Sequence, residues 1–69
     1  MAKANWADIE ELVKDWFDAG MQPTREDIMD RAYERDCNDD VIDAVDALNG
    51  KPVASLDVLK QQMTELGVI

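Results

Sequence analysis

The chain has 69 residues, of which 16 are acidic and 7 basic, and its net charge of −9 and single cysteine fit one small domain spanning residues 1–69. The lone Cys37 excludes an internal disulfide, and the lack of histidine leaves too few ligands for a structural zinc site. The negative charge disfavours direct binding to nucleic acid or to an anionic membrane. Because the charged N-terminal sequence contains neither a signal peptide nor a membrane span, we expect a soluble cytoplasmic protein.

The first predicted helix covers residues 6–19, between Asn5, a good N-cap, and Gly20, which suits a helix end. Its apolar residues recur at helical spacing and fill an arc of about 140°. They are Trp6, Ile9, Leu12, Val13, Trp16 and Phe17. Because this stretch holds both tryptophans and the only phenylalanine, we expect it to dominate the core.

The second predicted helix covers residues 25–36 and begins with a clear start signal. Pro23 keeps the preceding residue extended, Thr24 is an N-cap, and Asp27 stands where a capping box has its acid. The apolar face consists of Ile28, Met29, Ala32 and Tyr33.

The third predicted helix covers residues 39–48. Asn38 is its N-cap, two aspartates in its first turn suit the helix dipole, and Asn49–Gly50 is expected to end it. Its inward residues are Val41, Ala44, Val45 and Leu48.

The fourth predicted helix covers residues 56–66, from the N-cap Ser55 to Gly67, and Val53 in the preceding link is expected to plug the core. One face carries Leu56, Leu59, Met63 and Leu66. No stretch has the pattern of a strand. The predicted fold is therefore all-α, a compact bundle of four short helices.

Ser55 stands in a Ser-Leu-Asp sequence that is similar to the Asp-Ser-Leu site where acyl carrier proteins carry phosphopantetheine. Ala54 takes the place of the acid before that serine. Only 14 residues follow Ser55, enough for one helix, whereas the carrier fold needs two. Helix capping explains Ser55, and an acyl-carrier-like protein is a remote alternative.

Two other patterns suggest chemistry but lack essential parts. Residues 36–40 have the spacing of the first half of a calcium loop, but Val41 and Ala47 replace its glycine and its bidentate glutamate. Cys37 precedes a helix N-terminus, which favours a thiolate, but nearby acids oppose ionisation and no histidine can act as base. We therefore predict no enzyme, no metal site and no cofactor.

Acidic residues form stripes on the outer faces of the second and third predicted helices. Residues 25–50 carry a net charge of −6, whereas residues 51–69 are neutral. If the helices are neighbours, the stripes merge into a negative ridge that can dock a basic protein or imitate a phosphate backbone. The simpler alternative is that the charge only keeps the protein soluble. The candidate residues are Asp27, Asp30, Glu34, Asp39, Asp43 and Asp46.

Several apolar residues do not fit on the inner faces of the helices. In a small domain such residues often form a homodimer seam or a partner site. The candidates are Trp6, Tyr33, Val68 and Ile69, with Met21 and Val58 also left over.

From Trp16 to Met63 the chain carries a series of helix-start and helix-face motifs. They are Trp16–Phe17, Pro23–Thr24, Ile28, Ala32, residues 39–48, Ser55 and Asp57–Val58. On these residues the chain resembles a family of small bacterial proteins known as domain of unknown function 2795. The resemblance implies no established activity and no catalytic residue.

The leading hypothesis is a non-enzymatic protein-interaction or regulatory module. It follows from the absence of histidine, metal-ligand clusters and phosphate loops, together with the leftover apolar and acidic surface. We expect a protein partner; a basic partner and a homodimer are both left open. The alternative is an acidic inhibitor, for example a phage-encoded one, that imitates nucleic acid and binds a host nucleic-acid-binding protein.

Overall fold

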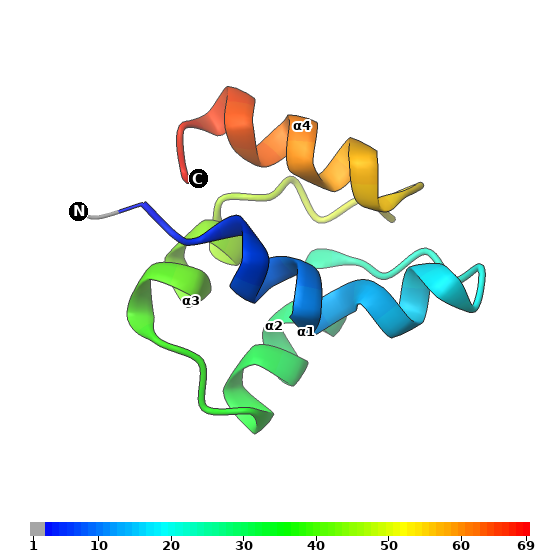
Figure 1. Cartoon of the computed structure of the whole chain (residues 1–69), viewed down its shortest axis with the longest axis horizontal. Helices are drawn as coiled ribbons and strands as arrows, with labels where there is room; N and C mark the ends of the chain where they lie inside the picture. Colours follow the sequence, from blue (N-terminus) through cyan, green and yellow to red (C-terminus); the bar gives the residue numbers. More distant parts are fainter. Residues whose placement is uncertain (1–2) are drawn as a thin grey trace.

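The computed structural model describes residues 3–69, and its regular elements there are four helices and no strand. The prediction of an all-α four-helix fold is therefore confirmed (Figure 1). Within the described residues no helix has both the length and the apolar character needed to cross a membrane. The helices are α1 (Trp6–Asp18), α2 (Arg25–Glu34), α3 (Asp39–Asp46) and α4 (Leu56–Leu66).

Each helix begins directly after its predicted N-cap. The Ser55 hydroxyl accepts a hydrogen bond from the Val58 amide at 3.2 Å, and Thr24 and Asp27 form the reciprocal capping box. These side chains satisfy amides that the first turn of a helix leaves unpaired, so they decide where each helix starts. The confirmed N-caps are Asn5, Thr24, Asn38 and Ser55.

The ends of α2 and α3 differ from the predicted ends. Helix α2 ends at Glu34 because Asp36 adopts a left-handed φ of 56°, which lets the Cys37 amide donate to the Ala32 carbonyl at 2.9 Å. An aspartate therefore closes a helix in the way that glycine usually does. Helix α3 ends at Asp46, and Asn49–Gly50 lies in the link that follows rather than at the helix end.

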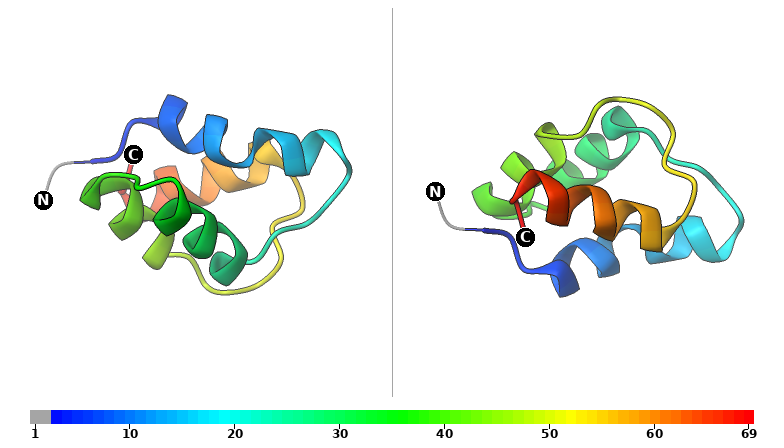
Figure 2. Two further views of the ribbon diagram at one scale, coloured as in Figure 1. Left: turned by 90° about the horizontal axis from the view of Figure 1, so that it is seen from below. Right: turned by 90° about the horizontal axis from the view of Figure 1, so that it is seen from above.

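The helices form two pairs. Helix α4 runs alongside α1 in the opposite direction, α3 packs against α2, and α1 also contacts α2 (Figures 1 and 2). Two backbone hydrogen bonds hold the connections in place. The Val53 amide donates to the Pro23 carbonyl at 2.9 Å, and the Ala4 amide donates to the Val68 carbonyl at 2.8 Å.

The core is aliphatic rather than aromatic. The expectation that the aromatic residues of the first helix dominate it is wrong, because Trp6, Trp16 and Phe17 are only partly buried and pack around its edge. An interior this small cannot surround an indole ring on all sides. Val53 fills the core as predicted. Among the described residues the buried hydrophobic core consists of Ala4, Ile9, Leu12, Val13, Ile28, Ala32, Val41, Ala44, Val45, Leu48, Val53, Leu59 and Met63.

Candidate functional site

Arg31 of α2 turns toward α1 and makes three contacts there. Its Nη1 lies 2.6 Å from Asp15 Oδ1 and 3.1 Å from the Leu12 carbonyl oxygen, and its guanidinium lies 3.4 Å from the centre of the Trp16 ring. The hydrogen bond from Arg31 is the main cause that holds the pKa of the Asp15 carboxyl below its ordinary value. This arginine therefore joins α2 to α1 and is used inside the fold.

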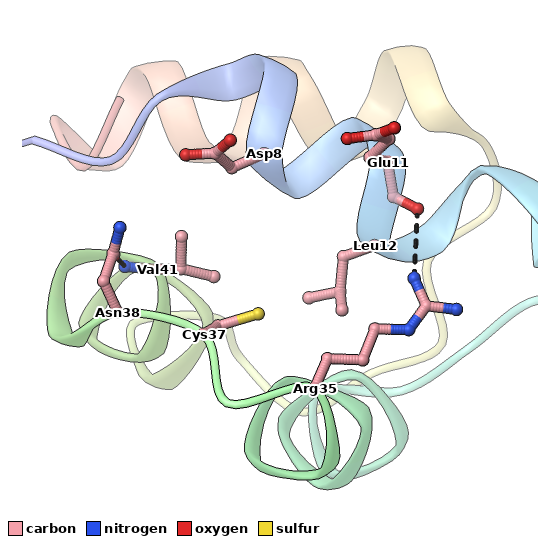
Figure 3. Close-up of a pocket in the computed structure, with 7 residues that line it drawn as sticks. All are labelled: Asp8, Glu11, Leu12, Arg35, Cys37, Asn38 and Val41. Carbon is pink, nitrogen blue, oxygen red and sulfur yellow. Dashed lines mark hydrogen bonds between the residues drawn. The ribbon is translucent and has the colours of Figure 1, made fainter.

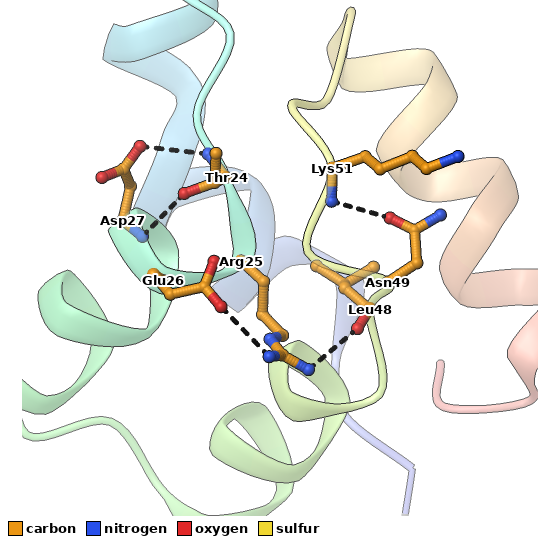
Figure 4. A network of polar contacts seen from close by, with 7 residues as sticks. All are labelled: Thr24, Arg25, Glu26, Asp27, Leu48, Asn49 and Lys51. Carbon is orange, nitrogen blue, oxygen red and sulfur yellow. Dashed lines mark hydrogen bonds and ion pairs between the residues drawn. The ribbon is translucent and has the colours of Figure 1, made fainter.

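Arg25 and Arg35 are also directed at other parts of the chain. Arg25 donates to the Leu48 carbonyl at 3.3 Å and to Glu26 at 3.0 Å, which ties the start of α2 to the end of α3 (Figure 4). Arg35 donates to the Glu11 carbonyl of α1 at 3.4 Å. The pKa of Glu26 is lowered, first by its own backbone amide and then by Arg25. All three arginines of residues 25–50 are thus engaged within the molecule.

The acidic candidates face the opposite way. The two ion pairs among residues 3–69 use Asp15 and Glu26, so no candidate acid is neutralised by a neighbouring cation there. The three arginines of residues 25–50 are therefore bonded to other parts of the fold, whereas the six candidate carboxylates of α2 and α3 face solvent. The exposed candidates are Asp27, Asp30, Glu34, Asp39, Asp43 and Asp46.

Asp27 does not share a surface with α3. Its carboxylate accepts from the Thr24 amide at 3.1 Å, as part of the capping box. In Figure 4 it lies on the side of α2 away from Leu48, which follows α3 in the chain. Asp27 is therefore engaged in capping its own helix.

The apolar candidates divide into one exposed residue and three that pack against the core. Tyr33 on α2 is 65% exposed. Trp6, Val68 and Ile69 are partly buried and contact the core, and the Val68 carbonyl also accepts from Ala4. Of the four, only Tyr33 offers most of its side chain to a partner.

A hollow of about 300 Å³ lies between α1, the link from α2 to α3 and the first turn of α3. The Cys37 sulfur points into it, facing Asp8 and Glu11 on α1 (Figure 3). No histidine stands there to take the thiol proton, and within residues 3–69 no three metal-ligating side chains gather closely enough to hold an ion. Its lining residues are Asp8, Glu11, Leu12, Arg35, Cys37, Asn38 and Val41.

Two further hollows, each of about 240 Å³, share Ala47 as a lining residue. One lies between the residues just after α3 and the C-terminal half of α4, and the other between α3, Lys3 and the Gly67–Val68 segment that follows α4. The sequence analysis put Leu66 on one helical face with Leu59 and Met63 and did not indicate these hollows. Leu59 and Met63 are buried, whereas Leu66 is 51% exposed and lies on the wall of one hollow. Helical periodicity shows which residues share a face, but not how far along that face the neighbouring helices extend.

Comparison with protein-family models, with curated proteins and with solved structures finds no match to this chain. The resemblance to domain of unknown function 2795 stays a prediction. The function is therefore argued from the surfaces described above.

Proposed function

We propose that the protein is a non-enzymatic interaction or regulatory module that binds a basic protein through the carboxylates of α2 and α3. The observation that carries the proposal is the sorting of charges on these helices. Their arginines bind carbonyls and carboxylates of the fold, whereas six carboxylates are exposed and unpaired within the described chain. A surface of one sign attracts and orients a partner of the opposite sign.

The strength and range of interactions between exposed charges predict how the affinity should depend on salt. One exposed ion pair contributes little, about 0.2 to 1 kcal/mol, so affinity has to come from several carboxylates acting together. Their attraction reaches only about 8 Å at physiological ionic strength. We therefore expect the affinity for the partner to fall strongly as salt is added.

Affinity capture from cells that naturally produce the protein would supply the partner, and calorimetry with the purified pair then tests the proposal. The test variant combines Asp39→Asn, Asp43→Asn and Asp46→Asn on α3. The matched control combines Asp8→Asn, Asp18→Asn and Asp57→Asn on α1 and α4, with the same change in net charge. We expect the test variant to lose affinity well beyond the control.

Equal losses in the two variants would show that the charge acts only through its total, which contradicts a binding surface on α3. Competition by DNA for the same partner would favour the nucleic-acid-mimicking inhibitor instead. Specific turnover of a metabolite by the pure protein would contradict both.

A further inference from the structure

We propose that the gap between α3 and α4 is a docking groove for a basic amphipathic helix of the partner, an inference that rests on the proposed binding of a basic protein. Helix α3 packs chiefly against α2 and α4 against α1. The two adjoining hollows lie where α3 and the residues after it face the C-terminal end of α4 and the Gly67–Val68 segment. In Figure 1 the two helices lie apart, with part of the connecting link between them. The bundle thus leaves a recess at this place.

The groove has an apolar floor made of small side chains. Ala44, Ala47 and Gly67 line it together with the partly buried Val68. Leu66 adds a large apolar side chain on one wall, half of which no other part of the fold covers. Small residues let a helix approach closely, and an amphipathic helix lays its apolar face into such a groove.

The polar residues around the groove favour a basic occupant. Asp40 and Asp43 lie on the α3 side and Glu65 on the α4 side, and Lys3 is the one cation among the lining residues. A helix with lysines or arginines beside its apolar face would place them next to these carboxylates. A second copy of this chain would instead bring two acidic rims together, each on a molecule of net charge −9.

The inference is tested by titrating the full ¹⁵N-labelled protein with a synthetic amphipathic helix of leucine and lysine and following its amide signals by NMR. A peptide with the same leucines, but glutamate in place of every lysine, is the control. We expect the lysine peptide to shift the amides of Ala44, Ala47, Leu66, Gly67 and Val68 most. The glutamate peptide should shift none of them.

Two matched substitutions show whether the groove itself binds. Leu66→Ala should weaken the affinity for the lysine peptide about fivefold or more, as expected when an apolar anchor is lost. Met21→Ala should leave it unchanged, because Met21 is 52% exposed, nearly the same as Leu66 at 51%, but does not line the groove.

The outcomes separate this inference from the proposed function. Shifts confined to the outer faces of α2 and α3, with Leu66→Ala neutral, would overturn the groove while leaving an acidic interaction module intact. Binding of both peptides would overturn the charge-based choice of occupant. An elution volume that falls with protein concentration in the wild type but not in Leu66→Ala would assign the groove to a second copy and overturn the proposal.

Discussion

The α1–α2 side and the α3–α4 side of the molecule differ in whether their charged and apolar side chains have partners within the fold. Between α1 and α2, Arg31 and Arg35 reach across to carbonyls of α1, and Arg31 adds an ion pair and a stacked ring. Between α3 and α4 lie two hollows with a half-exposed leucine and unpaired carboxylates.

The difference shows where a small bundle can gain binding energy from a partner. The α1–α2 side uses Arg31 and Arg35 in bonds to carbonyls of α1. The α3–α4 side keeps the half-exposed Leu66 and carboxylates that have no ion-pair partner within the described residues. An interaction surface is expected where the fold leaves such groups uncovered.

The largest predicted effect compares two leucines of α4. Leu59 is fully buried, so Leu59→Ala should lower the free energy of unfolding by about 2 to 5 kcal/mol. Leu66→Ala should change it by no more than about 0.5 kcal/mol, because that side chain is half exposed. Urea unfolding followed by circular dichroism measures both, and similar losses would mean that the α3–α4 side is closed in solution.

The second prediction concerns the contact between α1 and α2, which Arg31 makes. Arg31→Ala should lower the free energy of unfolding by about 1 to 2 kcal/mol, because it removes the cation–π contact and a partly buried hydrogen bond. Arg31→Lys should recover only part of the lost stability, since an ammonium group cannot stack on an aromatic ring as the planar guanidinium does. Arg35→Ala, which loses one hydrogen bond of 3.4 Å, is the control and should cost less. Full recovery by lysine would contradict this account of the contact.

Ser55 tests the start of α4. Ser55→Ala should cost about 1 kcal/mol because the Val58 amide loses its acceptor, and Ser55→Asp should restore most of it, since aspartate is also a good N-cap. Thermal unfolding of the three proteins measures these differences in stability.

The same serine tests the carrier alternative. Incubation of the wild type with coenzyme A and a phosphopantetheinyl transferase should leave its intact mass unchanged. A mass gain that Ser55→Ala abolishes would support the carrier alternative.

The smallest predicted effect is a pH dependence that comes from Asp15. Its pKa is lowered in the folded state, so the folded protein binds fewer protons at this group than the unfolded chain does. Its stabilising contribution is therefore present above the ordinary pKa of 3.8 and is lost as the pH falls through the lower folded value. The difference in unfolding free energy between wild type and Asp15→Asn should shrink as the pH is lowered through this range. A difference that stays constant would contradict the Arg31–Asp15 pairing.

The parts of the fold that depend on neighbouring residues in the chain could be predicted from the sequence. The side chains of Asn5, Thr24, Asn38 and Ser55 act within three residues of themselves, and each cap is where the sequence places it. The left-handed Asp36 was missed because a strained aspartate carries a weaker local signal than glycine.

The open groove and the inward arginines could not be predicted in this way. Whether Leu66 is covered depends on where α3 ends, and α3 ends at Asp46, earlier than its apolar pattern suggests. Arg31 reads as a surface residue in the sequence, and only the placement of α1 gives it the Leu12 carbonyl and the Trp16 ring. Such contacts join residues far apart in the chain, which periodicity does not relate.

The most direct test of the difference between the two sides is the accessibility of methyl groups to a neutral paramagnetic agent, measured by NMR on the free protein. The methyls of Leu66 and Ala47 should relax strongly, whereas those of Leu12, Leu59 and Ala32 should be protected. Protection of Leu66 and Ala47 to the same degree as Leu59 would show that the α3–α4 side is covered in solution and would contradict the account.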